Sequence, residues 1–131
     1  MSNQTAPDVT PGLISWKELN TKDGPGAKKF YGELFGWTTE EVDMGKGTYT
    51  IFKTGEQTVA GMFAYPPELA HLPVIWLNYV TVPNLEEAIE KAVKLGATLH
   101  KDVTELNMGR FAIIGDPQGA GLGLWEFKKP A

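Results

Sequence analysis

The chain has 131 residues, of which 42% are hydrophobic and 21% are charged, and its formal net charge is −4. This length and composition fit one globular domain, or two small modules that share a core. The Lys and Arg residues are scattered and form no basic stripe, so we expect no nucleic-acid partner. The absence of cysteine excludes disulfides, thiolate metal ligands and cysteine nucleophiles, and it fits a reducing compartment.

The first 12 residues are polar and lack the basic start and apolar run of a signal peptide. No stretch of the sequence is apolar over the length that a membrane span needs. We therefore expect a flexible leader over residues 1–12, no membrane partner and a cytoplasmic protein.

The first half of the chain predicts a strand, a helix and three further strands. Residues 13–20 alternate between apolar and polar side chains, which is typical of a half-buried strand. Asp23 is suited to cap the helix that follows, and Gly36 is suited to end it. Helical spacing predicts one buried helix face, formed by Ala27, Phe30, Tyr31 and Leu34. Strands are predicted over residues 38–43, 48–53 and 58–64, with turns at Gly45-Lys46-Gly47 and Gly55-Glu56.

The second half repeats this order after a linker. Residues 65–73 contain three prolines, so we expect a linker without regular structure. A strand is then predicted over 74–82, a helix over 85–95, and strands over 98–105, 110–114 and 121–128. Asp116-Pro117-Gln118-Gly119 predicts the turn before the last strand.

The two halves therefore predict an α+β fold made of two βαβββ modules in tandem. Gly36 and Gly96 each follow a predicted helix, and they lie 60 positions apart, close to half the chain. The modules are expected over residues 13–64 and 74–131, with a curled sheet and a cleft where they meet. Function is expected in that cleft.

Three segments carry a resemblance to a known family. They are Phe30-Tyr31-Gly32-Glu33-Leu34-Phe35-Gly36-Trp37, Lys94-Leu95-Gly96-Ala97 and Asp116-Pro117-Gln118-Gly119. In their order and spacing the chain resembles the vicinal oxygen chelate superfamily, which includes glyoxalase I, bleomycin-binding proteins and extradiol dioxygenases. The segments Trp16-Lys17-Glu18-Leu19 and Trp76-Leu77-Asn78-Tyr79 resemble a bacterial glyoxalase-like or hydroxylase-like branch.

This resemblance implies four positions where metal-dependent members bind a divalent ion through His, Gln or Glu. Carried over by spacing, the positions fall on Trp16, Leu77, Gly123 and about Met62 or Phe63. None of these side chains can hold a hard or borderline cation through nitrogen or oxygen. We therefore expect no metal cofactor at the family's usual positions.

The remaining polar candidates are Glu18 and Tyr79. Glu18 lies two residues beyond Trp16 and so shares its strand face, where burial would raise its pKa and suit it to acid–base work. Its alternative role is to pair with a backbone group or a lysine. Tyr79 holds the matching position in the second module, where it would bond a ligand or Glu18, or serve as a core aromatic. The expected walls of the ligand site are Trp16, Met62, Leu77 and Trp125.

A metal site displaced from the usual positions would need other ligands, and Glu126, His71 and His100 are the candidates in the sequence. Glu126 faces away from Gly123 unless a bulge intervenes, and His71 and His100 are isolated in the sequence. With Glu18 they are the side chains that such a site would use.

The first functional hypothesis is a metal-free module that binds a small apolar or aromatic molecule, as bleomycin-binding relatives do. The alternatives are a metal-dependent lyase, isomerase or dioxygenase with displaced ligands, and a metal-free acid–base enzyme with Glu18 and Tyr79 as its catalytic residues. Whether the protein is an enzyme stays open. The short sheets would gain from burying an edge against a second copy, so we expect a homodimer.

Overall fold

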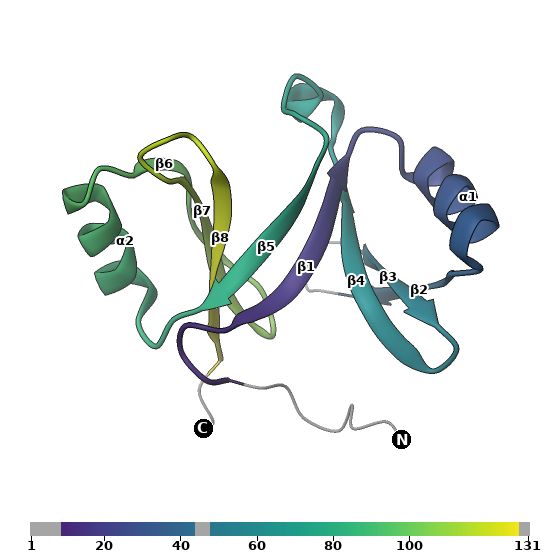
Figure 1. Cartoon of the computed structure of the whole chain (residues 1–131), viewed down its shortest axis with the longest axis horizontal. Helices are drawn as coiled ribbons and strands as arrows, with labels where there is room; N and C mark the ends of the chain where they lie inside the picture. The colour runs from purple at the N-terminus through teal and green to yellow at the C-terminus, as the bar shows by residue number, and fades with distance from the viewer. Residues whose placement is uncertain (1–8, 44–47, 129–131) are drawn as a thin grey trace. The chain divides into compact units, whose positions relative to one another are not determined.

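The computed structural model describes residues 9–43 and 48–128 (Figure 1). The order βαβββ occurs twice, which confirms the predicted α+β fold. The first set is β1 (Ile14–Thr21), α1 (Gly24–Phe35), β2 (Thr38–Asp43), β3 (Thr48–Thr54) and β4 (Gln57–Ala64). The second is β5 (Ile75–Thr81), α2 (Leu85–Lys94), β6 (Thr98–Glu105), β7 (Gly109–Gly115) and β8 (Gly121–Phe127). The turn predicted at Gly45-Lys46-Gly47 and most of the predicted leader lie outside the described residues.

Both helices begin where the sequence indicated, and α1 ends before Gly36 as predicted, whereas α2 ends at Lys94, one residue before the predicted end. The Asp23 carboxylate accepts a hydrogen bond from the Gly26 N–H at 2.9 Å, and the Asn84 side chain accepts one from the Glu87 N–H at 3.0 Å. Each bond satisfies a backbone donor that the first helical turn leaves unpaired. Gly36 ends α1 in the left-handed conformation, with φ 77°, which a residue without a Cβ adopts at little cost.

The chain forms two compact units. Of the described residues, unit 1 comprises 17–43 and 48–76, and unit 2 comprises 9–16 and 77–128. Unit 2 includes the start of β1 because this segment bonds to Thr81. The Thr81 N–H donates to the Leu13 carbonyl at 2.9 Å, and the Thr81 carbonyl accepts from the Gly12 N–H at 2.8 Å.

The proline-rich segment between the modules is more regular than predicted. A 3-10 helix spans Pro67–Leu69, and the Leu69 N–H donates to the Pro66 carbonyl at 2.9 Å. Proline is compatible with the first turn of such a helix because no partner exists there for the missing N–H. The expectation of no regular structure over residues 65–73 was therefore wrong.

In unit 1 the strands lie in the order β2-β3-β4-β1, and α1 packs against one face of this sheet (Figure 1). The core consists of Leu19, Phe52 and Met62, with Ala27, Tyr31, Trp37 and Val59 packed around it. The prediction of a fully buried helix face was wrong for Phe30 and Leu34, whose exposed fractions are 58% and 57%. Tyr31 and Trp37 already cover the core beneath the helix, so the side chains of Phe30 and Leu34 lie outside the core.

In unit 2 the strands lie in the order β5-β8-β7-β6, and α2 covers one face (Figure 1). Leu85, Ala112, Ile114 and Leu124 form the core between this helix and the sheet. The β7–β8 pairing is regular over its whole length, from Gly109 opposite Phe127 to Gly115 opposite Gly121. No bulge therefore interrupts this pair of strands near Glu126, and Glu126 lies on the opposite face from Gly123.

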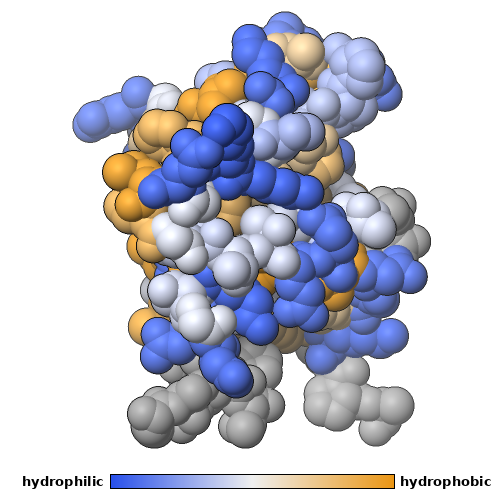
Figure 2. All heavy atoms as spheres, turned by 90° about the vertical axis from the view of Figure 1, so that its right-hand side faces the viewer, coloured by the Kyte–Doolittle hydropathy of each residue, from blue (hydrophilic) through white to orange (hydrophobic). Residues whose placement is uncertain are grey.

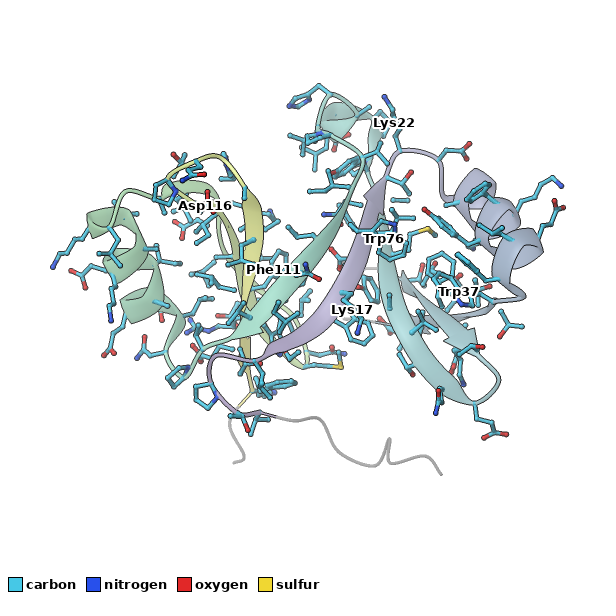
Figure 3. All side chains as sticks on the ribbon, in the orientation of Figure 1. Lys17, Lys22, Trp37, Trp76, Phe111 and Asp116 are labelled. Atoms are coloured by element: carbon cyan, nitrogen blue, oxygen red, sulfur yellow. The ribbon has the colours of Figure 1, made fainter. Side chains whose placement is uncertain are left out.

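The turn between β7 and β8 forms as predicted. The Asp116 carboxylate accepts hydrogen bonds from the N–H groups of Gln118 and Ala120, at 2.8 and 3.0 Å (Figure 3). These bonds, the one from Ala120 first, hold the pKa of Asp116 below its usual value. Over the described residues, neither helix is long and apolar enough to cross a membrane.

Candidate functional site

Each unit has one sheet face under its helix and one face without a helix, which we call the helix-free face. Side chains alternate between the two faces along every strand. In unit 1, Leu19 and Met62 point to the helix, so Glu18 and Gly61 belong to the helix-free face. In unit 2, Leu124 points to the helix, so Gly123 and Trp125 belong to the helix-free face.

Glu18 is the buried acid on the helix-free face of unit 1. Its exposed fraction is 9%, and its carboxylate accepts a hydrogen bond of 2.5 Å from the Tyr49 hydroxyl. Tyr49 reaches this position because its side chain lies over Gly61, which has no Cβ. A Cβ at position 61 would overlap the ring and the hydroxyl of Tyr49. Gly61 stands opposite Glu18 in the parallel β1–β4 pair, so the glycine makes the space in which the acid and the phenol meet.

Asn20 lies two residues beyond Glu18 on the same face. Its exposed fraction is 5%, and its Oδ1 atom is buried without a hydrogen-bond partner. Phe63 stands opposite Asn20 on β4, and the Phe63 and Tyr65 rings meet edge to face with centroids 5.8 Å apart. The Tyr65 hydroxyl donates to the Pro73 carbonyl at 2.7 Å. Burial and the negative charge of Glu18 raise the pKa of Tyr65.

The helix-free face of unit 2 is aromatic. The Tyr79 ring covers Gly123, and the Phe111 ring meets Tyr79 edge to face at 6.1 Å (Figure 3). A Cβ at Gly109 would lie 2.8 Å from the Trp125 ring, so this indole lies across Gly109. Glycines on β7 and β8 thus leave room for flat side chains to lie against the sheet.

The two units repeat one arrangement at equivalent positions. Glu18 stands opposite Gly61 between the first and last strands of the first module, and Tyr79 stands opposite Gly123 in the second. The repeat counterpart of Gly123 is therefore Gly61, and the assignment of that position to Met62 or Phe63 was wrong by one or two residues. Met62 packs against Leu19 and Phe52 under α1, on the opposite face from Glu18, and its predicted role as a ligand wall does not follow from this position.

The metal positions that the resemblance implies do not carry suitable donors in this chain. With the register corrected they are Trp16, Leu77, Gly61 and Gly123, which offer no nitrogen or oxygen that a divalent cation prefers. The space over each glycine is filled by a tyrosine ring. Within residues 9–43 and 48–128, no three His, Asp or Glu side chains lie close enough together to hold a metal ion.

Glu126 belongs to a network with Arg110 on the side of α2. Its carboxylate accepts hydrogen bonds of 2.7 Å from the Leu85 N–H at the start of α2 and from Arg110. Arg110 also makes a bidentate pair with Glu86, which lowers the pKa of Glu86 to about 2. Burial alone would raise the pKa of Glu126, but the bonds from Arg110 and Leu85 together lower it.

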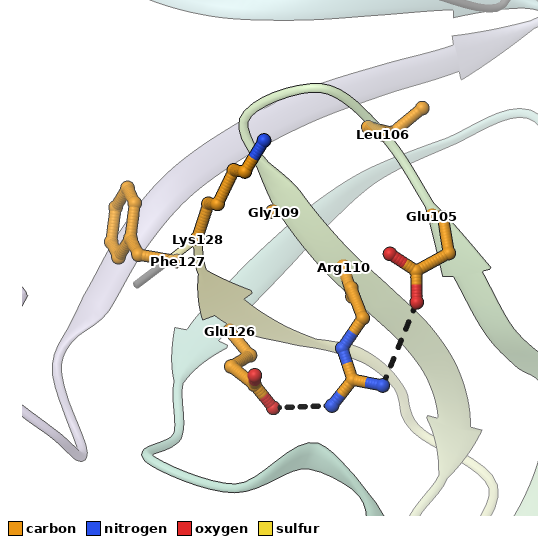
Figure 4. Close-up of a pocket in the computed structure, with 7 residues that line it drawn as sticks. All are labelled: Glu105, Leu106, Gly109, Arg110, Glu126, Phe127 and Lys128. Atoms are coloured by element: carbon orange, nitrogen blue, oxygen red, sulfur yellow. Dashed lines mark hydrogen bonds and ion pairs between the residues drawn. The ribbon is translucent and has the colours of Figure 1, made fainter. Parts of the chain in front are cut away.

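This network lines a hollow of about 270 Å³ at the ends of β6, β7 and β8 (Figure 4). Arg110 points toward Glu126 and, at 3.7 Å, toward Glu105 across the hollow. Because carboxylates surround its guanidinium, Arg110 fastens α2 to the sheet and does not present a free charge to an anionic ligand.

The residues predicted for the site are thus distributed between the units. Trp16, Leu77, Tyr79 and Trp125 lie in unit 2, whereas Glu18 and Met62 lie in unit 1. His71 is exposed beyond the 3-10 helix, and His100 lies across Gly115.

The sequence analysis missed two residues of the helix-free face of unit 1. Asn20 could have been found, since it continues the period-two pattern of Trp16 and Glu18 on one strand. Tyr49 could not, because its place depends on how β3 and β4 pair with β1.

Comparisons with known proteins agree with this architecture. The model of the Glyoxalase/Bleomycin resistance protein/Dioxygenase superfamily matches residues 13–124. The chain is 34% identical over 119 residues to "Putative glyoxylase CFP32" of Mycobacterium tuberculosis, covering 88% of this chain and 46% of that protein. It is 29% identical over 131 residues to "Anthracycline biosynthesis protein DnrV" of Streptomyces peucetius, covering 88% and 47%. The chain therefore spans about half the length of these relatives.

Solved structures support the fold alone. Methylmalonyl-CoA epimerase from Mycobacterium tuberculosis matches with a TM-score of 0.59 and 16% identity, covering 96% of this chain and 94% of that one. Protein BH1468 from Bacillus halodurans matches with a TM-score of 0.60 and 12% identity, covering 92% and 97%.

The packing of Tyr79 over Gly123 can be tested by a double-mutant cycle. Gly123→Ala places a methyl group into the Tyr79 ring and is expected to lower the free energy of unfolding by about 1–3 kcal/mol, as overpacking does. In a Tyr79→Ala background the same change should cost less than about 0.5 kcal/mol, because the ring is gone. Urea unfolding of the four proteins measures both values.

Gly32→Ala in α1 is the matched control. A Cβ there meets no atom closer than 3.4 Å and improves helix propensity, so no loss of stability is expected. An equal cost of Gly123→Ala with and without the Tyr79 ring would show that the ring does not lie over this glycine.

Proposed function

Because the chain belongs to the Glyoxalase/Bleomycin resistance protein/Dioxygenase superfamily, we propose that it binds a small apolar or aromatic molecule without a metal ion. The aromatic helix-free face of unit 2 is the surface that this function would use. Phe111 and Trp125 are partly exposed there beside the buried Tyr79 ring, and flat ligands stack on such aromatic side chains.

The observation that carries the proposal is the pair of glycines at the inherited metal positions. Gly61 and Gly123 supply no ligand atom, and tyrosine rings occupy the space that a carboxylate would need. A surface built of rings favours binding by shape and apolar contact over Lewis-acid chemistry. Two relatives are named for anthracycline biosynthesis, and anthracyclines are aromatic compounds, which supports an aromatic ligand.

Titration with 2-methylnaphthalene tests this function. Protein dialysed against EDTA is expected to bind this probe as tightly as undialysed protein, and added Zn²⁺, Ni²⁺ or Mn²⁺ should not change the dissociation constant. Trp125→Leu should weaken binding roughly threefold to tenfold, the size of a lost aromatic contact. Tryptophan fluorescence and calorimetry measure both effects.

Trp76→Leu is the control, because it removes a side chain of the same size from unit 1 (Figure 3). Trp76 lies in the aromatic cluster beside α1, where its Nε1 donates to the Tyr31 hydroxyl at 3.2 Å. The substitution should leave the dissociation constant unchanged. Binding that disappears with EDTA and returns with a metal ion would replace the proposal by the metal-dependent alternative.

A second candidate is a metal-free acid–base enzyme centred on Glu18. The 2.5 Å bond from Tyr49 to a nine-tenths buried carboxylate favours it, since such a pair can hold and pass a proton. The test is deuterium exchange of the methyl protons of 2-acetylnaphthalene in D₂O, followed by NMR. An acid–base enzyme would exchange them faster than buffer, and Glu18→Gln would remove the acceleration. Exchange at the buffer rate would exclude this candidate for such ketones.

We also propose that the chain forms a homodimer through α1. Phe30, Leu34 and Phe35 on α1 have exposed fractions of 58%, 57% and 55%, and the rings of Phe30 and Phe35 both contact the Tyr31 ring. Figure 2 shows apolar residues exposed beside charged ones on the side where α1 lies. An apolar patch of this kind is unusual on a monomer.

Leu34→Glu is expected to convert the dimer into a monomer, because a charge would be buried in the contact. Sedimentation velocity measures the change in mass. Leu95→Glu is the matched control, since Leu95 is 70% exposed at the end of α2 and should leave the dimer intact. A wild-type protein that sediments as a monomer at about 100 µM would contradict the proposal.

A further inference from the structure

The helix-free face of unit 1 contains a buried hydrogen-bond acceptor that nothing in the described structure satisfies. Asn20 is 5% exposed, and its Oδ1 atom has no partner. Nearly all buried polar atoms in proteins are paired, because an unpaired acceptor gives up its bonds to water and gains nothing in return. An exception therefore needs an explanation, and a bound molecule that donates to this atom is one.

The groups around Asn20 favour a donor as the missing partner. The Tyr49 hydroxyl donates to Glu18 at 2.5 Å, and the Tyr65 hydroxyl donates to the Pro73 carbonyl at 2.7 Å. Each hydroxyl has one hydrogen, so neither can also donate to Asn20. Strand alternation places Glu18 and Asn20 side by side on β1, where they form a pair of acceptors, one of them an acid.

An apolar neighbour completes this surface. Phe63 stands opposite Asn20 and is 40% exposed, and its ring meets Tyr65 edge to face. A molecule that bonds Asn20 would therefore place an apolar part against Phe63. A positively charged donor would gain further from the Glu18 carboxylate, since charge-assisted hydrogen bonds are stronger than neutral ones.

We propose that Asn20 and Glu18 form a recognition site on unit 1 for the primary ammonium or hydroxyl group of a small aromatic-bearing ligand, with the ammonium preferred. This goes beyond the proposed function, which rests on apolar contacts in unit 2. Asn20 is a specificity residue: its Oδ1 accepts the N–H or O–H of the ligand, and Glu18 supplies the negative charge.

Four probes that differ in one group test the proposal. They are 2-naphthylmethylamine, 2-naphthalenemethanol, 2-methylnaphthalene and 2-naphthoate, titrated by calorimetry at pH 7. The amine is expected to bind roughly tenfold or more tighter than the methyl compound, the alcohol to lie between them, and the carboxylate to bind worst. In Asn20→Leu the ratio of amine to methyl affinity should fall by most of this factor, and the preference that remains is the contribution of the Glu18 charge.

A stability measurement separates this role from a structural one. Asn20→Leu replaces an unsatisfied acceptor by an apolar group of similar size, so its urea midpoint should rise even as the preference for the amine falls. Asn78→Leu on β5 is the matched control, because Asn78 is exposed, and it should change neither value. A lower urea midpoint for Asn20→Leu would show that the amide serves the fold and would overturn the proposal.

The outcomes distinguish this proposal from the proposed function. Trp125 lies in unit 2, so Trp125→Leu should leave the tighter binding of the amine on unit 1 unchanged, whereas Asn20→Leu should remove it. If the four probes bind wild-type protein equally, or if Asn20→Leu keeps the preference, the recognition site is refuted while apolar binding stands. If no probe binds, both are refuted.

Discussion

The parallel pairing of the first and last strand in each module is the constraint on which the rest of the structure depends. It sets Glu18 opposite Gly61 and Tyr79 opposite Gly123. Because both last-strand positions are glycine, a tyrosine ring lies over each of them, and the buried surface becomes phenolic where relatives with metal ions would need ligand atoms. A single carboxylate at either glycine would be incompatible with the ring above it.

The two faces of each sheet carry different kinds of side chain. The faces under α1 and α2 hold the apolar cores, and in unit 2 also the ion pairs of Arg110 with Glu86 and Glu126 that fasten the start of α2. Glu126 contributes to stability there, through a helix N-terminus and a guanidinium, so it is not available as a ligand on the other face. The helix-free faces carry the residues without an obvious structural need: the Glu18–Tyr49 pair, the unpaired Asn20 and the aromatic group around Tyr79.

The elements of the fold could be predicted from the sequence because their signals are local. Asp23, Gly36 and Asn84 mark helix ends through bonds and dihedral angles within a few residues, and alternation marks the strands. The site was harder because it depends on register. Counting along the sequence placed the fourth metal position at Met62 or Phe63, and a shift of one residue moves a side chain to the other face. Tyr49 bonds Glu18, which lies 31 positions earlier in the sequence. This contact depends on how the strands pair, and no local sequence pattern predicts that pairing.

Buried polar groups on a face without a helix lower the stability of the folded chain. An acid that is 9% exposed loses most of its hydration, and hydrogen bonds such as the one from Tyr49 recover part of it. The unpaired Oδ1 of Asn20 loses its hydrogen bonds to water on folding and gains none in the protein. Apolar side chains at these positions would avoid the losses, as Leu19 and Met62 do on the face under α1. The apolar core on that opposite face provides the stability that permits the polar side chains.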